Sequence, residues 1–150
     1  LFVSGCTHKC KGCFNEEAQD FNYGEEFTEE TIETILKSIE PGYISGLSLL
    51  GGEPAEIPNQ KALLPLLRQF KERFPQKNIW CYTGYTYETD LLDKNGKARC
   101  EATDEFLSFI DILVDGEFDQ DLYDISLKFC GSSNQRLLQI QKEGCPELVI

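Results

Sequence analysis

Three of the seven cysteines in this 150-residue chain stand within eight positions, at Cys6, Cys10 and Cys13. The C-x3-C-x2-C spacing lets three thiolates on one short loop surround a single inorganic centre. A cubane iron–sulfur cluster is usually held by four cysteines, so three local ligands would leave one iron open to a substrate or cofactor. An odd number of cysteines disfavours a disulfide framework, and we expect free thiols in a reducing cytoplasm.

A structural zinc site is the main alternative for this loop, with a fourth ligand from His8 or a distant cysteine. Zinc ligands usually occur as two separated pairs, and no second pair accompanies Cys10 and Cys13. A redox-active pair formed by the same two cysteines is a further alternative. His8 is the only histidine, and we expect it to be solvated or to support the site from outside the ligand set. A hydrolase built on a Ser–His–Asp or Cys–His arrangement is disfavoured, since no Asp partner lies near it.

Charge and hydropathy exclude two classes of partner. Lys and Arg number 14 against 26 Asp and Glu, giving a formal net charge of −12. Such a chain has no general affinity for phosphate backbones, so we expect no nucleic-acid partner. No apolar run approaches the roughly 18 residues of a membrane span, so we expect no membrane partner.

The length fits one domain covering residues 1–150. The sequence contains no Met. We therefore expect Leu1 to lie inside a longer natural chain whose preceding residues complete the first strand.

Hydrophobic periodicity and breaker residues predict strands and helices in alternation. We expect strands at residues 1–3, 44–50, 78–83, 112–114 and 127–129. We expect helices capped by Thr28 and Asn59, and shorter helices at 86–92, 103–109 (capped by Thr103) and 133–140.

This alternation predicts an α/β fold with a mostly parallel sheet and helical crossovers. A closed eight-stranded β/α barrel needs about 250 residues, so we expect a partial, open β/α barrel. The loops after the strands, at residues 4–13, 51–54, 83–85 and 115–117, should meet at one face of the sheet. All the candidate motifs fall in these loops.

The segment SGCTHKCKGCFN (residues 4–15) resembles the cluster loop of radical S-adenosylmethionine (SAM) enzymes. More narrowly, the chain is similar to the activating proteins of anaerobic ribonucleoside-triphosphate reductases. The similar blocks are LLGGEP (49–54), IWCYTGY (79–85), VDGEF (114–118) and GSSNQ (131–135). The resemblance runs from Leu1 to about Leu138 and implies a radical SAM-like fold.

The resemblance implies that Cys6, Cys10 and Cys13 hold a [4Fe–4S] cluster whose fourth iron is chelated by the amino and carboxylate groups of SAM. It further implies that one electron from an external low-potential donor cleaves SAM into methionine and a 5′-deoxyadenosyl radical. That radical would take a hydrogen atom from a glycine of the reductase's glycyl radical subunit. In such an enzyme the protein supplies position and a dry cavity.

The same resemblance suggests the contacts to SAM. Gly51 and Gly52 would receive its ammonium group, with Glu53 adding favourable charge or a structural hydrogen bond. The ring of Phe14 would lie against the adenine. Thr83 and Asp115 join the candidates because they leave their strands at the same face.

Each of these residues also has a purely structural interpretation, as a tight turn, a strand exit or core packing. Two functions therefore stay open beside the reductase activator. One is an activator of a different glycyl radical enzyme, and the other is a zinc-stabilised interaction module without catalysis. The cysteines outside the loop receive no role from the resemblance: Cys81, Cys100, Cys130 and Cys145.

Overall fold

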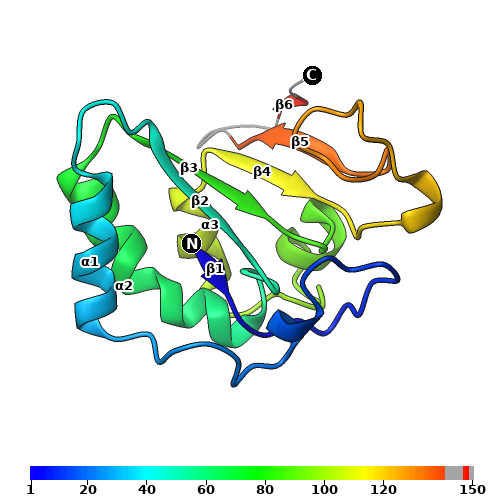
Figure 1. The fold of residues 1–150 in the computed structure, drawn as a ribbon, viewed down its shortest axis with the longest axis horizontal. Helices are drawn as coiled ribbons and strands as arrows, with labels where there is room; N and C mark the ends of the chain where they lie inside the picture. Colours follow the sequence, from blue (N-terminus) through cyan, green and yellow to red (C-terminus); the bar gives the residue numbers. More distant parts are fainter. Residues whose placement is uncertain (141–146, 149–150) are drawn as a thin grey trace.

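The computed structural model describes residues 1–140 and 147–148. Its centre is a six-stranded sheet in the order β1-β2-β3-β4-β5-β6 (Figure 1). The strands are β1 (Phe2–Val3), β2 (Gly46–Gly51), β3 (Asn78–Tyr82), β4 (Ile112–Asp115), β5 (Arg136–Gln139) and β6 (Glu147–Leu148). The first four are parallel, whereas β5 is antiparallel to β4 and β6 is antiparallel to β5.

Three α-helices pack on one face of this sheet (Figure 1). They are α1 (Glu29–Ile39), α2 (Ile57–Arg73) and α3 (Thr103–Phe109). A π-helical turn (Tyr87–Leu92) follows β3, and short 3-10 turns cover Glu16–Gln19 and Gln120–Leu122. Thr28 caps α1 as expected: its side chain accepts a hydrogen bond from the Thr31 amide, and the Thr31 hydroxyl accepts one from the Thr28 amide.

The core lies between the helices and one face of the sheet. The strand register aligns Leu49, Cys81, Leu113 and Leu138 in one row across four strands. All four side chains are buried and belong to the same apolar cluster as the inner faces of the helices. Cys81 therefore packs as a small hydrophobic residue.

The opposite face of the sheet is covered by a loop segment rather than by helices. Trp80 lies there, and its ring packs against Phe129 with 5.0 Å between the ring centroids. Phe129 belongs to the long connection between β4 and β5 and has a positive φ of 63°, which is unusual for a residue other than glycine. This connection therefore folds back over the face that the helices leave free.

The structure confirms an open α/β fold with a mostly parallel sheet. It also confirms the strands expected at residues 1–3, 44–50, 78–83 and 112–114, within one or two residues. The strand expected at 127–129 and the helix expected at 133–140 are wrong. Strand β5 occupies Arg136–Gln139 instead. Its adjacent residues Leu137 and Leu138 are both buried, which occurs in a strand whose sheet is covered on both faces, since successive side chains point to opposite faces.

Two predicted helix caps are also wrong. Helix α2 begins at Ile57, ahead of Asn59, whose side-chain amide donates instead to the carbonyls of Ser4 and Glu53 at 2.9 Å each. In α3 the N-cap is Ala102, and the buried hydroxyl of Thr103 donates to the Gln60 side chain at 2.7 Å. In both cases a tertiary contact takes the polar side chain that the sequence offered as a cap.

The strand-end loops meet at one face, as expected. The Glu53 amide donates to the Gly5 carbonyl at 2.8 Å, which joins the loop after β2 to the loop after β1. The Gly116 amide donates to the Tyr85 carbonyl at 3.2 Å, which joins the loop after β4 to the loop after β3. No helix in the part of the chain that the structure describes has the length and apolar character to traverse a bilayer.

Candidate functional site

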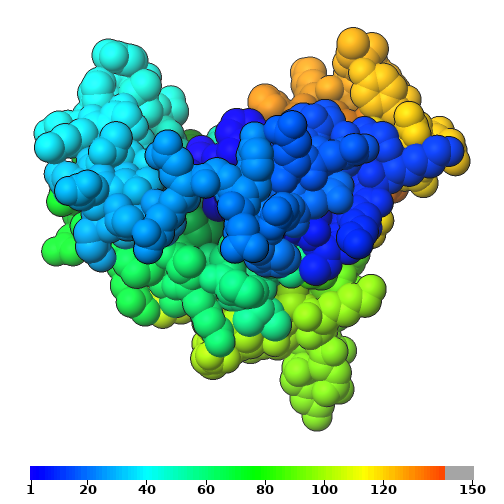
Figure 2. All heavy atoms as spheres, turned by 60° about the horizontal axis from the view of Figure 1, so that its bottom comes forward, coloured from blue at the N-terminus to red at the C-terminus, as the bar shows by residue number. Residues whose placement is uncertain are grey.

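The cysteine loop leaves β1 and runs across the face formed by the strand-end loops. Figure 2 shows this N-terminal segment, in blue, spread over one side of the molecule next to the gold β4–β5 connection. The loop is tied down at its start because the Gly5 amide donates to Ala18 at 2.7 Å and the Cys6 amide donates to Gln19 at 3.1 Å. Gly5 has a φ of 97°, a conformation that side chains other than glycine rarely adopt.

The structure places the three predicted ligands Cys6, Cys10 and Cys13 on this one loop, each partly buried. The Cys13 amide donates to the Cys10 carbonyl at 3.2 Å, which forms a turn between them. Within the described residues, however, no three His, Cys, Asp or Glu side chains converge closely enough to hold a metal ion. The thiols are therefore neighbours on one loop rather than a closed ligand cage.

Two thiols of the loop have pKa values above the ordinary value of a cysteine. Burial raises the pKa of Cys6 above its ordinary value. Burial, the charge of Glu117 and the nearby Cys6 raise the pKa of Cys10 to about 11, and Cys13 adds to this effect. Protonated thiols must lose their protons to bind a metal, so cluster binding by this loop would release protons. Three thiols on one loop fit an iron–sulfur cluster as a donor set.

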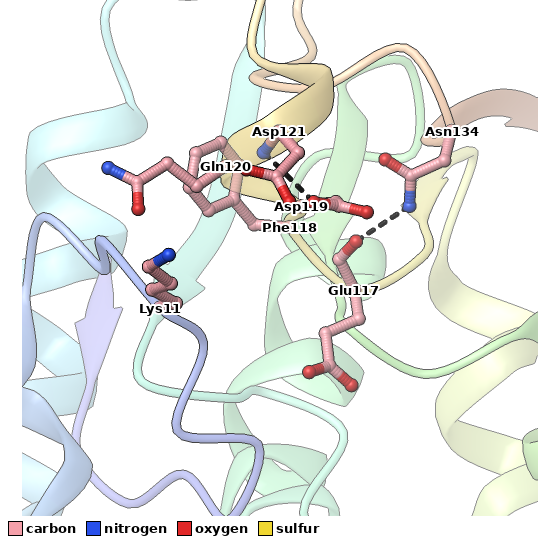
Figure 3. A pocket seen from close by; sticks show the side chains of 7 residues that line it. All are labelled: Lys11, Glu117, Phe118, Asp119, Gln120, Asp121 and Asn134. Atoms are coloured by element: carbon pink, nitrogen blue, oxygen red, sulfur yellow. Dashed lines mark hydrogen bonds between the residues drawn. The ribbon is translucent and has the colours of Figure 1, made fainter.

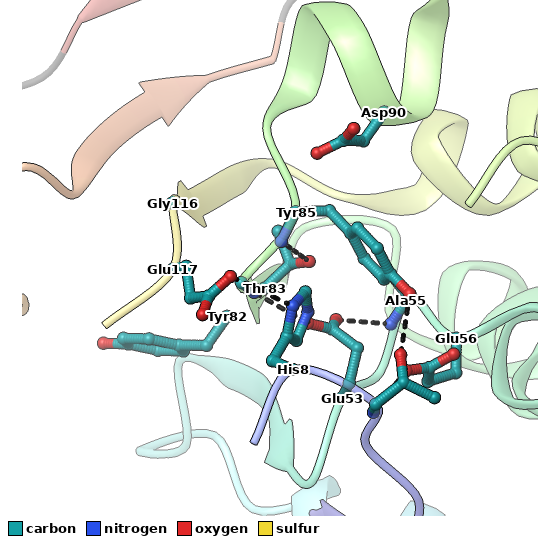
Figure 4. A network of polar contacts seen from close by, with 12 residues as sticks. His8, Glu53, Ala55, Glu56, Tyr82, Thr83, Tyr85, Asp90, Gly116 and Glu117 are labelled. Carbon is teal, nitrogen blue, oxygen red and sulfur yellow. Dashed lines mark hydrogen bonds and ion pairs between the residues drawn. The ribbon is translucent and has the colours of Figure 1, made fainter. Parts of the chain in front are cut away.

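Glu53 is the centre of a hydrogen-bond network beneath the loop (Figure 4). Its side chain is only 1% exposed. One carboxyl oxygen accepts from the Ala55 amide at 2.8 Å, and the other accepts from the His8 ring and from the Gly84 amide, both at 2.7 Å. Glu53 therefore joins the cysteine loop, the start of α2 and the exit of β3. The structure supports its predicted structural hydrogen bond.

Glu56 holds the neighbouring residue of the loop. Its Oε1 atom accepts from the Thr7 amide at 2.8 Å and from the Thr7 hydroxyl at 2.7 Å. The same hydroxyl lies 3.4 Å from the hydroxyl of Tyr85. Glu56 is 7% exposed, so both residues between Cys6 and Lys9 are held by buried carboxyl groups.

His8 supports the loop from the protein side. Its ring lies edge-on to Tyr85, with 4.4 Å between the ring centroids, and its Nδ1 atom is 3.6 Å from a carboxyl oxygen of Glu117. Burial lowers the pKa of His8, but its hydrogen bond to Glu53 and the nearby acidic charges raise it more, so the pKa lies above its ordinary value. The contact to Glu53 agrees with the supporting role expected for His8.

Gly51 and Gly52 allow the backbones of two loops to approach each other. A Cβ atom on Gly51, whose φ is 148°, would lie 2.2 Å from the Val3 carbonyl oxygen. A Cβ atom on Gly52 would lie 2.6 Å from the Gly5 carbonyl oxygen. The chain's own backbone therefore requires both glycines, and their contact with SAM stays a prediction.

The other predicted contact residues occupy contrasting environments. Phe14 is 86% exposed on the cysteine loop. Thr83 is buried, and its hydroxyl accepts from the Tyr85 amide at 3.1 Å. Asp115 is 1% exposed and accepts from the Tyr87 amide at 2.9 Å and from Arg136 at 2.6 and 2.9 Å. All three lie at the strand-end face, and their roles toward SAM remain predictions.

A pocket of about 330 Å³ lies beside the cysteine loop (Figure 3). Lys11 contributes from the cysteine loop, and the remaining lining residues come from the β4–β5 connection: Glu117, Phe118, Asp119, Gln120, Asp121 and Asn134. The Asn134 side chain donates to the Glu117 carbonyl at 2.7 Å. The pocket is therefore shaped by the connection that also covers the free face of the sheet.

The sequence did not point to Glu56, and it gave Thr7 no role beyond its place in the cysteine loop. Gln135 lies in the similar block GSSNQ (131–135), but its hydrogen bonds could not be read from that block. The Gln135 side chain accepts from the amides of Gly131 and Ser132 and donates to the Gly116 carbonyl at 3.0 Å, which closes the base of the β4–β5 connection. The one sequence signal for a shared role was the spacing of Glu53 and Glu56, which stand three residues apart before an apolar helix. This spacing can place both side chains on the same side of a turn, but it does not reveal that both contact the cysteine loop.

Comparison with known proteins agrees with this site. The family model described as a 4Fe-4S single cluster domain matches residues 1–138 and defines the class of the protein. An anaerobic ribonucleoside-triphosphate reductase-activating protein of Haemophilus influenzae is 41% identical over 137 residues, which cover 90% of this chain and 83% of the relative. The present chain belongs to the family of these activating proteins.

Two further relatives carry the same description. The protein of Escherichia coli is 39% identical, with 90% of this chain and 83% of the relative covered. The protein of Enterobacteria phage T4 is 36% identical, with 91% and 80% covered. No solved structure matched the chain.

Proposed function

We propose that this protein is a radical SAM activase, formed by one domain over residues 1–150, that generates the glycyl radical of an anaerobic ribonucleoside-triphosphate reductase. The observation that carries the proposal is the single loop with three neighbouring thiols at the strand-end face, in a chain of the activating-protein family. The open sheet is compatible with a partial radical SAM barrel.

Cys6, Cys10 and Cys13 are the proposed ligands of the [4Fe–4S] cluster. A cluster held by these thiols would supply one-electron transfer from an external low-potential donor to SAM, the chemistry by which SAM would give methionine and the 5′-deoxyadenosyl radical needed to take a hydrogen atom from a glycine of the reductase. Lys9 and Lys11 lie between the ligands and offset part of the negative charge of the thiolates. The reaction takes place in the cytoplasm, where thiols stay reduced.

The proposed SAM contacts divide into two groups. The backbone of Gly51 and Gly52 receives the ammonium group, and the exposed ring of Phe14 covers the adenine. Glu53, Thr83 and Asp115 are buried and hydrogen-bonded to the protein, so they act by shaping the loops around SAM. A site assembled from rigid strand ends holds its ligand in position without further ordering.

The direct test mixes the anaerobically reconstituted, reduced protein with SAM and the reductase, and measures the glycyl radical by electron paramagnetic resonance. We expect the radical signal with the wild-type chain. Replacing Cys10 by Ser should abolish the signal and 5′-deoxyadenosine formation, because a ligand is lost from a loop outside the core. The control is Cys130→Ser, a partly buried thiol outside the loop, which should keep both.

Two outcomes would contradict the proposal. One is continued 5′-deoxyadenosine formation by the Cys10→Ser variant. The other is a colourless wild-type protein that holds about one zinc per chain and cleaves no SAM, as expected of a structural zinc module.

A further inference from the structure

The two residues that follow Cys6 are held by separate buried carboxyl groups. Glu56 accepts two hydrogen bonds from Thr7, and Glu53 accepts one from His8. Both acids come from the short connection between β2 and α2, which the core holds firmly because Ala55 is fully buried. The segment between the first two cysteines is therefore attached to the rigid part of the molecule (Figure 4).

The Glu56 contact is the more specific of the two. Glu56 is the N-cap residue of α2, yet its side chain makes no capping hydrogen bond and is directed to Thr7 instead. Because both donors of Thr7 meet the same oxygen, Oε1, the contact needs one acceptor atom. Removing that acceptor would leave the Thr7 amide without its partner in a part-buried contact, which disfavours this conformation of the loop.

The second half of the loop has weaker attachments. Lys11, Gly12 and Phe14 are exposed, and the Gly12 backbone approaches the side chain of Gln120. A flexible glutamine at the surface restrains a loop less than a buried carboxyl group does. Beyond the backbone bonds at its start, the cysteine loop is therefore held by buried carboxyl groups at Thr7 and His8.

We propose that Glu56 and Thr7 are a positioning pair for the iron–sulfur cluster: their contact fixes the backbone between Cys6 and Cys10 and thereby determines how long the three thiols retain the cluster. The inference rests on the proposed function, in that it takes these cysteines as the ligands. Residues that orient metal ligands typically contribute 10- to 100-fold to metal affinity or activity. The chemical requirement is the acceptor oxygen of residue 56.

Replacing Glu56 by glutamine or by methionine separates the effect of the acceptor oxygen from the effects of the negative charge and the length of the side chain. Glu56→Gln keeps a carbonyl oxygen that can accept from Thr7, whereas Glu56→Met has a similar length and no comparable acceptor. Thr7→Val is a milder variant that removes the hydroxyl and keeps the amide donor. The matched control is Glu72→Met, an exposed glutamate on the same helix.

The experiment measures cluster loss in the reconstituted protein, without SAM or reductase, as the rate at which an iron chelator bleaches the cluster absorbance. We expect Glu56→Met to lose the cluster 10- to 100-fold faster than wild type, and Thr7→Val to fall between the two. Glu56→Gln and Glu72→Met should stay within about threefold of wild type. In the iron-free protein, hydrogen exchange at the Thr7 amide should be faster in Glu56→Met and little changed in Glu56→Gln, while circular dichroism shows that both are folded.

The inference would be overturned if Glu56→Met and Thr7→Val retained the cluster as well as wild type does. Equal losses in Glu56→Gln and Glu56→Met would also overturn it, since charge rather than the acceptor would then be responsible. A wild-type chain that takes up no iron would remove the proposed function as well, so the two failures are distinguishable.

Discussion

Glu53 and Asp115 are two acids with the same burial and different roles. Both lie at the ends of parallel strands, both are 1% exposed and both accept three hydrogen bonds. Two of the bonds to Asp115 come from the guanidinium of Arg136 on the neighbouring strand β5. The bonds to Glu53 come from the backbone of two loops and from the only histidine.

A buried acidic side chain can thus serve the fold at one strand end and the cysteine loop at another. A buried charge beside an opposite charge is compensated, and it locks the two strands together. A buried carboxyl group that collects loop amides instead sets the positions of loops. We therefore expect changes around Asp115 to affect folding most, and changes around Glu53 to affect the cysteine loop most.

The largest expected effect is that of Arg136→Met. This change leaves the Asp115 carboxyl group buried without its partner charge, and it should lower the free energy of unfolding by roughly 3 kcal/mol. Urea unfolding of the iron-free protein, followed by circular dichroism, measures it. A loss smaller than that caused by changing Glu53 would reverse the comparison.

Glu53→Gln should have the next largest effect. Both carboxyl oxygens accept from N–H groups, so either orientation of the new amide places an NH2 group against a donor. We expect a loss of about 1–3 kcal/mol in the same unfolding experiment. Cluster loss to a chelator should also become faster than in Arg136→Met at a temperature where both variants are folded. Equal cluster retention in the two variants would argue against the division of roles.

Gly84→Ala should have a smaller effect on stability and a specific effect on His8. A Cβ atom at this position would lie 2.7 Å from the His8 ring, which must move away from Glu53. We expect a cost of roughly 1 kcal/mol. Since the contact with Glu53 helps to raise the pKa of His8, its loss should lower that pKa. An NMR titration of the single histidine in the iron-free protein measures the change, and an unaltered pKa would show that the ring kept its contact.

Glu88→Gln should have the smallest effect. Glu88 is half exposed and pairs with Arg136 at 2.7 Å, and this hydrogen bond lowers the pKa of Glu88 below its ordinary value. A lowered acid pKa contributes stability above the ordinary pKa of 4.5, and this contribution disappears as the pH falls through the lower folded-state value. We expect a difference of about 0.5 kcal/mol or less at pH 7 that vanishes in acid. A difference that persists in acid below the folded-state pKa of Glu88 would exclude the ion pair as its source.

Most of the fold could be predicted from local sequence signals. Thr28 caps its helix as predicted, and the breaker residues after the parallel strands placed the strand-end loops on one face. The region after Gly116 was predicted poorly. Strand β5 is defined by its pairing with β4 and by the Asp115–Arg136 contact, which joins residues 21 positions apart and has no local pattern.

The candidate site was predictable to the extent that it is local. The cysteine spacing identified the loop, and the Gly-Gly-Glu segment identified the connection beneath it. The sequence could not show that Thr7 meets Glu56 across 49 positions. It also could not show that Gly51 and Gly52 are required by neighbouring backbone, since this depends on how closely β1 approaches β2.

The packing of Trp80 on Phe129 gives the molecule a natural optical probe. Trp80 is the only tryptophan of the chain, and it reports on the β4–β5 connection because its ring contacts a residue of that segment. Any partner or ligand that lifts this segment from the sheet would expose the indole to water and shift its fluorescence to longer wavelength. Movement of the β4–β5 connection can therefore be followed by the fluorescence of the unlabelled protein.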